Sequence, residues 1–349
     1  TPENALSPDI ARQELPGGIL APGFVDLQVN GGGGVMFNTA PTIETLATIA
    51  AAHARLGATT LLPTLITDTP EVTRAAIAAV VDALNQNVPG IAGLHLEGPH
   101  LCPARKGAHA GTLIRPMAAA DEAMMIAAAD KLPGLKVTLA PEAVTPEQIG
   151  RLTDAGIIVS LGHSDCTVEE AEAAQAAGAI CVTHLFNAMS QMTARAPGLV
   201  GTALSNGALS AGLIADGIHV HPENMRAALA AKAGPGGSFL VSDAMAPAGS
   251  DITRFELNGR EIQRANGRLT LADGTLAGAD LDLATAIRNV RSLGVDLVEA
   301  LTMATSRPAQ VAGLSGGQGR LAPEGPADFV HLTDELHLSA VWQNGARLG

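Results

Sequence analysis

Eight short runs rich in β-branched and apolar residues recur along this chain, mostly separated by alanine-rich stretches that are compatible with helix. Strand-like runs that alternate with helical patterns are typical of parallel βαβ units. Eight such units are the number found in a (β/α)8 barrel, whose active site lies at the carboxyl ends of its strands. The sequence therefore predicts an α/β fold built on a TIM-like (β/α)8 barrel. The expected strands are Phe24–Asn30, Ala58–Thr64, Ile91–Glu97, Leu135–Glu142, Ile157–His163, Ala179–His184, Leu209–Asp216 and Phe239–Asp243.

Four of these runs end on a residue that can bind a metal or transfer a proton: Glu97, His163, His184 and Asp243. Two imidazoles and one carboxylate are a common ligand set for catalytic zinc, which keeps one position open for water or substrate. Zinc acidifies bound water and polarises carbonyl oxygens, so this set favours a hydrolase. Asp243 could take the proton of the water and pass it to a leaving amine. A single histidine at a strand end is more often a hydrogen-bonded structural residue than a ligand, so the indication depends on their coincidence.

Helix-start signals support the alternation of strands and helices. Thr145-Pro146-Glu147 combines an N-cap residue with proline at the first helical position, and Thr167 with Glu170 forms a capping-box pattern. After Asp243, Asn-Gly and Asp-Gly steps divide short strand-like runs, which predicts a β-hairpin insertion around residues 252–275. The expected helices are Thr42–Leu56, Pro70–Asn85, Met117–Lys131, Thr145–Asp154, Thr167–Ala177, Leu281–Leu293 and Leu297–Thr305.

The two ends of the chain differ from the middle in their sequence pattern. Residues 1–21 lack helical periodicity, and Ala327–Leu332 and Ala340–Trp342 read as strands. We expect residues 1–21 and 325–349 to pair as a small β-subdomain beside a barrel that spans residues 22–324.

Composition limits the partners of the chain. Hydrophobic residues make up 47% and charged residues 16% of the 349 residues, which predicts a compact globular protein. A net charge of −13 disfavours nucleic acid and anionic membranes as partners, although a few local cations can still hold a small anionic substrate. No apolar run approaches the roughly 18 residues of a membrane helix. Three cysteines without a C-x-x-C pair suit a reduced compartment, so a cytoplasmic location is expected.

Short motifs around the candidate residues carry more specific information. They resemble those of the N-acetylglucosamine-6-phosphate deacetylase family of the amidohydrolase superfamily, and they occur in order from about residue 10 to the carboxyl end. The motifs are Pro22-Gly23-Phe24-Val25-Asp26, His95-Leu96-Glu97-Gly98-Pro99, Lys106-Gly107-Ala108-His109, Gly162-His163-Ser164, Thr183-His184-Leu185-Phe186-Asn187-Ala188-Met189, Arg195-Ala196-Pro197-Gly198, Ala215-Asp216-Gly217-Ile218-His219, Ser242-Asp243-Ala244-Met245-Ala246-Pro247 and Thr275-Leu276-Ala277-Gly278.

The resemblance implies a role for each matching residue. It implies that Glu97, His163 and His184 bind one divalent metal ion, usually zinc, and that Asp243 is the catalytic acid and base. It implies that His109 contacts the sugar and helps to polarise the acetamide carbonyl. The residues that it implies for substrate binding are Ala108, His109, Asn187, Ala188, Arg195, Asp216, Gly217, Ile218, His219, Leu276, Ala277 and Gly278.

Plainer readings exist for several of these residues. Arg195 is equally compatible with an ordinary surface cation, and His219 or His221 with a residue that caps a loop. Asp216 before Gly217 is a frequent turn arrangement. Gly31-Gly32-Gly33-Gly34 lacks the phosphate-binding G-x-x-x-x-G-K pattern and is expected to be a flexible turn. Glu142 ends a strand without an assigned role.

The chain departs from the wider superfamily in two ways. Gln28-Val29-Asn30 stands where many amidohydrolases have His-x-His on the first strand, and amides are poor zinc ligands, so one metal ion rather than two is expected. Family members also usually have more residues before the Pro-Gly-Phe motif, which leaves open whether the β-subdomain is complete at its amino-terminal side.

The implied activity is hydrolysis of the acetamide of N-acetyl-D-glucosamine 6-phosphate to D-glucosamine 6-phosphate and acetate. The resemblance places this reaction in amino-sugar catabolism and cell-wall sugar recycling, and it implies a homodimer in which Arg195 or His219 could reach the partner's site. Two rivals are kept. One is a related amidohydrolase that acts on a cyclic amide or on another acetamido sugar, such as N-acetylgalactosamine 6-phosphate. The other is a barrel that binds sugar phosphate without catalysis.

Overall fold

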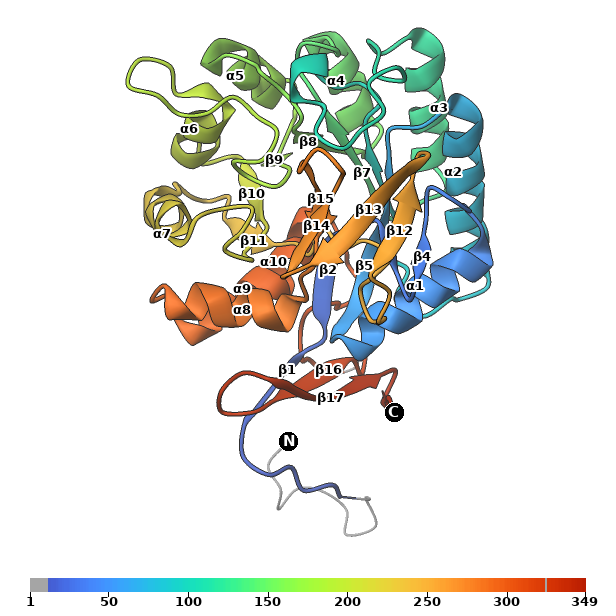
Figure 1. Ribbon diagram of the computed structural model, residues 1–349, viewed down its shortest axis with the longest axis vertical. Coiled ribbons are helices and arrows are strands. Elements are labelled where there is room, and N and C mark those ends of the chain that lie inside the picture. The colour runs from blue at the N-terminus through green and yellow to red at the C-terminus, as the bar shows by residue number, and fades with distance from the viewer. Residues whose placement is uncertain (1–11, 324) are drawn as a thin grey trace.

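The computed structural model describes residues 12–323 and 325–349. Eight parallel strands form its central sheet in the order β11-β10-β9-β8-β7-β6-β5-β2 (Figure 1). A parallel bridge between Val29 and Ala244 joins the two ends of this order and nearly closes the barrel. The predicted (β/α)8 barrel is therefore confirmed. The strands are β2 (Phe24–Val29), β5 (Ala58–Ile66), β6 (Leu94–Glu97), β7 (Leu135–Leu139), β8 (Ile158–Leu161), β9 (Cys181–Val182), β10 (Ser210–Leu213) and β11 (Ser238–Leu240).

Six of the eight strands end one to three residues earlier than the sequence predicted, and three of these stop before a candidate metal-binding or proton-transfer residue. The expected runs through His163, His184 and Asp243 stop at Leu161, Val182 and Leu240. The reason is backbone geometry, since φ is 47° at His163, 32° at His184 and 49° at Asp243. A left-handed residue cannot continue a strand, so the chain turns at each of these positions. Glu97 alone of the four is the last residue of its strand.

The predicted helices form within two residues of their expected ends. Thr145 and Gln148, and likewise Thr167 and Glu170, make reciprocal capping-box hydrogen bonds. Three further α-helices in the described part of the chain were not predicted: α6 (Gly198–Ser205), α7 (Pro222–Ala231) and α10 (Ser306–Val311). Two glycines weaken the helical signal of α6, which forms because almost the whole helix is buried. The confirmed helices are α1 (Ile43–Arg55), α2 (Pro70–Asn85), α3 (Ala119–Ala129), α4 (Pro146–Asp154), α5 (Val168–Ala176), α8 (Leu283–Ser292) and α9 (Leu297–Ala304).

An antiparallel sheet follows β11, in the region where a hairpin insertion was predicted. Its strands are β12 (Arg254–Leu257), β13 (Arg260–Ala265), β14 (Arg268–Thr270) and β15 (Leu276–Ala279), drawn in orange in Figure 1. Leu257, Ile262 and Leu269 of this sheet pack in one small apolar cluster with Ile66 and Met245 at the carboxyl ends of the barrel strands. The insertion therefore covers one side of the barrel mouth.

The glycine-rich segment after β2 is more ordered than expected. Gly31–Gly32 (β3) pairs with Val35–Met36 (β4) as a short antiparallel hairpin, so only Gly33 and Gly34 make the turn. A side chain at Gly31 would meet the backbone of Val35 and Ala246 at less than 3 Å, which explains the need for glycine there.

A second small sheet joins the two ends of the described chain. β1 (Ile19–Pro22) pairs antiparallel with β16 (Phe329–Leu332), which continues to β17 (Leu338–Gln343) and β18 (Ala346–Arg347). It lies below the barrel in Figure 1, next to the start of β2. Of the expected subdomain, residues 1–11 lie outside the described residues. Within the described ranges, no helix has both the length and the hydropathy that crossing a membrane requires.

Hydrogen-bonded polar side chains fill the barrel interior beneath the mouth. Ser160 Oγ lies 2.6 Å from Thr183 Oγ1, which lies 2.6 Å from Thr138 Oγ1. Thr138 Oγ1 is 2.7 Å from His95 Nε2, and His95 Nδ1 is 3.2 Å from Thr64 Oγ1. These five residues, here called the polar belt, link the strands β5 to β8 and the residue that directly follows β9.

Candidate active site

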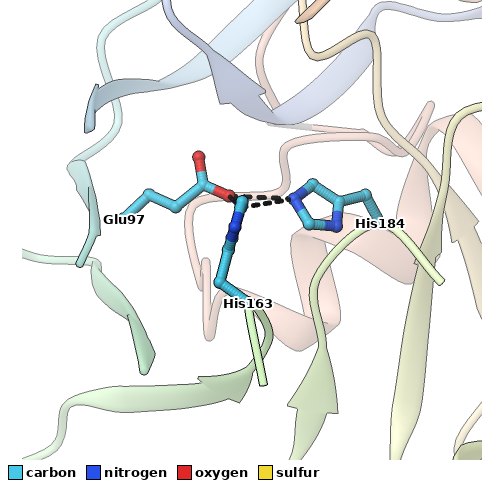
Figure 2. A group of neighbouring side chains, drawn as sticks. All are labelled: Glu97, His163 and His184. Atoms are coloured by element: carbon cyan, nitrogen blue, oxygen red, sulfur yellow. Dashed lines mark hydrogen bonds and ion pairs between the residues drawn. The ribbon is translucent and has the colours of Figure 1, made fainter. Parts of the chain in front are cut away.

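Glu97, His163 and His184 meet at the mouth of the barrel, as the sequence predicted for a metal site. Glu97 Oε1 lies 3.2 Å from His163 Nε2 and 3.0 Å from His184 Nε2, and the two Nε2 atoms are 3.1 Å apart (Figure 2). All three residues are buried. Glu97 ends β6, whereas the histidines come from the turns after β8 and β9. One potential ligand atom from each residue lies within 4.8 Å of the others.

The hydrogen bonding of His163 shows why this group suits a cation. His163 Nδ1 lies 2.8 Å from the carbonyl oxygen of Arg105, which can only accept, so Nδ1 carries a proton. In the neutral imidazole Nε2 is then a lone-pair acceptor, and it faces a second imidazole nitrogen and a carboxylate oxygen. A shared cation stabilises these converging imidazole and carboxylate groups, and two histidines with one carboxylate form a ligand set that suits zinc. The residues present therefore fit one divalent metal ion.

The charges within this group are strongly coupled. Burial alone would raise the pKa of the Glu97 carboxyl, but hydrogen bonds from His163 and His184 hold that pKa well below its ordinary value. Burial alone would lower the pKa of His163, yet the Glu97 carboxylate raises that pKa above its usual range. A proton on His163 therefore competes with a metal ion for the same site, as expected for metal ligands.

Asp243 lies beside the group and is held by two amides of β2 and its end. Asn30 Nδ2 donates to Asp243 Oδ1 over 2.8 Å, and Gln28 Nε2 donates to the same oxygen over 3.1 Å. Gln28 Nε2 also lies 3.2 Å from Glu97 Oε1, so one amide bridges both carboxylates. Burial, followed by the nearby charge of Glu97, raises the pKa of Asp243 above its ordinary value. A carboxyl with a raised pKa is suited to accepting and returning a proton.

His109 faces the same cavity from the loop between β6 and α3. Its Nδ1 lies 2.7 Å from Thr67 Oγ1, directly after β5, and its ring packs edge-on against His163 with centroids 4.3 Å apart. Burial, then the neighbouring His163, lowers the pKa of His109 well below its ordinary value. His109 is thus neutral near pH 7 and can donate a hydrogen bond from its ring.

Most of the predicted site residues line one cavity of about 240 Å³. The structure brings to this cavity the following members of the predicted set: Glu97, Ala108, His109, His163, His184, Asn187, Ala188, His219, Asp243, Leu276 and Gly278. The lining also includes six residues that the sequence analysis did not single out for the site: Asn30, Ile66, Gly107, Ile214, Met245 and Thr275. Ile66 is the last residue of β5 and Ile214 directly follows β10, so position at a strand end could have found them.

Five predicted substrate residues do not line this cavity. Arg195 lies in the exposed segment 191–197, and Ala277 is buried in the apolar cluster of the insertion. Asp216 holds His219, since its Oδ2 lies 2.6 Å from His219 Nδ1 and its Oδ1 accepts from the backbone N–H groups of Ile218 and His219. Gly217 and Ile218 complete this turn. Asp216 therefore orients His219 rather than facing the cavity itself.

Comparison with known proteins decides the family. The model of the amidohydrolase family matches residues 19–347. The chain belongs to the amidohydrolase family. A relative from Shewanella sp. (strain ANA-3) named N-acetylgalactosamine-6-phosphate deacetylase is 44% identical to this amidohydrolase, over 97% of this chain and 86% of the relative. The human protein named N-acetylglucosamine-6-phosphate deacetylase is 36% identical, over 96% of this chain and 84% of its own length.

Solved structures agree with this assignment. The crystal structure of N-acetylglucosamine-6-phosphate deacetylase from Pasteurella multocida has a TM-score of 0.94 and 33% identity, and covers 100% of this amidohydrolase and 91% of that chain. A mutant of the Mycobacterium smegmatis deacetylase in complex with N-acetyl-D-glucosamine-6-phosphate has a TM-score of 0.89 and 31% identity, over 98% and 90% of the two chains. The fold and the sequence thus place this amidohydrolase among amino-sugar-phosphate deacetylases.

Proposed function

We propose that this amidohydrolase removes the acetyl group of N-acetyl-D-glucosamine 6-phosphate, giving D-glucosamine 6-phosphate and acetate. The observation that carries the proposal is the meeting of Glu97, His163, His184 and Asp243 in one cavity of a chain that belongs to this family. The ligand set fits one divalent cation, which we propose to be zinc. When bound, the ion supplies Lewis-acid polarisation of the acetamide and a water of lowered pKa.

The residues of the chain divide the remaining chemistry among them. We propose that Asp243 takes a proton from the attacking water and returns it to the departing nitrogen. Because both β2 amides donate to its Oδ1, its other oxygen is free for this exchange within the described part of the chain. The neutral His109 donates a hydrogen bond to the acetamide oxygen as charge develops there, which is where a fixed donor gains most. Leu276 and Gly278 cover the sugar from the insertion.

The phosphate needs hydrogen-bond donors, and the candidates are His219 and Arg195. His219 lines the cavity, and Asp216 fixes its Nδ1, so Nε2 is available to the substrate. Arg195 is exposed outside this lining and lies three residues after Met192 in the sequence, a side chain that is 59% exposed. An exposed arginine close in sequence to an exposed large apolar residue supports a homodimer in which Arg195 reaches the phosphate of the partner's substrate. We further propose a cytoplasmic location, in amino-sugar catabolism, and a small β-subdomain formed by the two chain ends.

The test is acetate release from N-acetyl-D-glucosamine 6-phosphate compared with the sugar that lacks the phosphate. We expect one metal ion per subunit and a kcat/KM at least about 100-fold higher for the phosphorylated sugar, because about 3 kcal/mol from charged hydrogen bonds corresponds to that ratio. Metal-loaded protein that releases no acetate from either sugar would overturn the proposal.

A second substrate is favoured by one specific observation, the 44% identity to the Shewanella N-acetylgalactosamine-6-phosphate deacetylase. The two sugar phosphates share the acetamide and the phosphate, and they differ only at the C4 hydroxyl. The proposed metal chemistry serves both equally. Parallel kcat/KM measurements on the two sugars would assign the preference, and a ratio above about 10 in favour of the galactosamine compound would correct the substrate but not the reaction.

A further inference from the structure

A clasp formed by Glu142 with Ser164 and Asp165 holds the turn that carries His163. Glu142 follows β7 in a turn, and both of its carboxylate oxygens bind the neighbouring turn after β8. Ser164 Oγ donates to Glu142 Oε2 over 2.6 Å, and the backbone N–H of Asp165 donates to Glu142 Oε1 over 2.5 Å. Ser164 is completely buried and its hydroxyl also accepts the N–H of Cys166 over 3.1 Å. Both residues that follow His163 are therefore fixed by one carboxylate.

A second set of contacts holds the same turn from the opposite side. The N–H of Cys102 donates to the His163 carbonyl over 2.8 Å, and His163 Nδ1 donates to the Arg105 carbonyl over 2.8 Å. The Arg105 guanidinium pairs with Asp165 at 2.7 Å, which links this side to the residue bound by Glu142. The imidazole of His163 is thus oriented by a closed ring of contacts.

The turn needs such restraint because of its backbone. His163 has a φ of 47°, a left-handed conformation that costs a non-glycine residue of the order of 1–3 kcal/mol and persists only where the surroundings enforce it. Residues that orient a metal ligand typically change metal affinity 10- to 100-fold when they are removed. Nothing in the proposed chemistry uses the Glu142 carboxylate, although it is bound by two short hydrogen bonds.

We propose that Glu142 is a positioning residue, which holds the Ser164-Asp165 turn so that His163 Nε2 points at the metal site. Removing the carboxylate would leave the Ser164 hydroxyl and the Asp165 N–H without this acceptor, and the His163 turn would relax towards ordinary backbone angles. The ligand would then move away from Glu97 and His184, and the affinity for the cation would fall. The inference rests on the proposed metal site and deepens it.

The test measures metal binding rather than turnover. Zn²⁺ affinity is obtained by competition with a chelator, and the visible absorption spectrum of Co²⁺ bound in the same site reports on ligand geometry. We expect Glu142→Ala to weaken Zn²⁺ binding 10- to 100-fold and to alter the Co²⁺ spectrum. Glu142→Gln, which keeps one acceptor, is expected to recover part of the Zn²⁺ affinity and part of the wild-type Co²⁺ spectrum. This variant replaces Glu142→Ala in the test if the alanine variant fails to fold.

Glu170→Ala is the matched control, because it also removes a carboxylate that accepts a backbone N–H, that of Thr167, near the same turn. It is expected to leave Zn²⁺ affinity and the Co²⁺ spectrum unchanged. Wild-type affinity and spectrum in both Glu142 variants, or an equal loss in Glu170→Ala, would overturn the clasp. His163→Ala separates this failure from a failure of the metal site: wild-type Zn²⁺ affinity in that variant would overturn the site itself, and the clasp with it.

Discussion

The mouth of the barrel and the polar belt beneath it are both buried and polar, but they differ in how their hydrogen-bonding groups are used. At the mouth, Gln28 Oε1, Asn30 Oδ1 and His184 Nδ1 have no partner within the described chain. In the belt, the hydroxyl and ring nitrogen atoms are joined from Ser160 to Thr64. Among the described residues, the mouth therefore keeps buried polar atoms without partners, whereas the polar atoms of the belt are paired.

Lys136 fixes which atoms donate and which accept in the hydrogen bonds of the belt. Its Nζ lies 3.3 Å from His95 Nε2 and 3.4 Å from Thr183 Oγ1, and an ammonium can only donate. His95 Nε2 must accept, so the ring proton lies on Nδ1 and points to Thr64. Burial, followed by the charge of Lys136, lowers the pKa of His95 well below its ordinary value, which keeps this ring neutral.

Backbone geometry separates the two regions in the same way. The belt residues His95, Thr138 and Ser160 belong to regular strands, while His163, His184 and Asp243 have positive φ. Strained positions are expected where surrounding structure enforces a functional geometry. Burial of polar side chains alone does not identify the functional site in this protein. The site is identified by imidazole and carboxylate groups that converge and by the strained backbone of several of the residues that carry them.

The largest difference between the regions should appear on removing a mouth ligand. Glu97→Ala is expected to lose stoichiometric metal and to lower kcat/KM at least about 1000-fold, since the metal supplies several kcal/mol to the transition state. The metal-free variant should unfold at a temperature no lower than metal-free wild type, because no belt contact involves Glu97. A well-folded Glu97→Ala variant that keeps both metal and turnover would contradict the claim that the mouth, unlike the belt, binds the metal and supports catalysis.

The pH dependence of stability tests the region below the mouth, where the buried carboxyl of Asp26 lies. Burial raises the pKa of its carboxyl to about 7, despite hydrogen bonds from Ser242 and Gln28. The stability that protonated Asp26 contributes is therefore fully present below about pH 4 and is lost as pH rises through about 7. Asp26→Asn carries no such proton, so its free energy of unfolding should gain on that of wild type between pH 4 and 8, by at most about 4 kcal/mol. Parallel urea titrations measure the gap; a gap constant with pH would contradict the expected shift.

Thr138 tests the belt itself. Thr138→Val keeps the shape but leaves His95 and Thr183 each without one partner, which is expected to lower the free energy of unfolding by about 1–3 kcal/mol with or without metal. Metal content and kcat should stay within about threefold of wild type. Thr138→Ser retains the hydroxyl and is the matched control. A large loss of activity at unchanged stability would mean that the belt takes part in the chemistry.

The same contrast explains what the sequence could predict. The barrel follows from strand-like runs with helical stretches between them, and Glu97, His163 and His184 were found because strand ends coincide with family motifs. The turns at His163, His184 and Asp243 were missed, because left-handed backbone at a histidine or aspartate has no local signal. The Thr67–His109 contact joins residues 42 apart in sequence, and only the folded chain reveals it. The partner of Glu142 was hidden for the same reason.

The most direct test of the account is Asp243→Asn, with bound metal and acetate release from N-acetyl-D-glucosamine 6-phosphate measured on the same preparation. Asn30, Gln28 and the three ligands remain in place, so one metal ion per subunit should be retained. Turnover should fall at least about 100-fold, because an amide cannot exchange the proton between water and leaving nitrogen. Full metal occupancy with undiminished acetate release would contradict the assignment of proton transfer to Asp243.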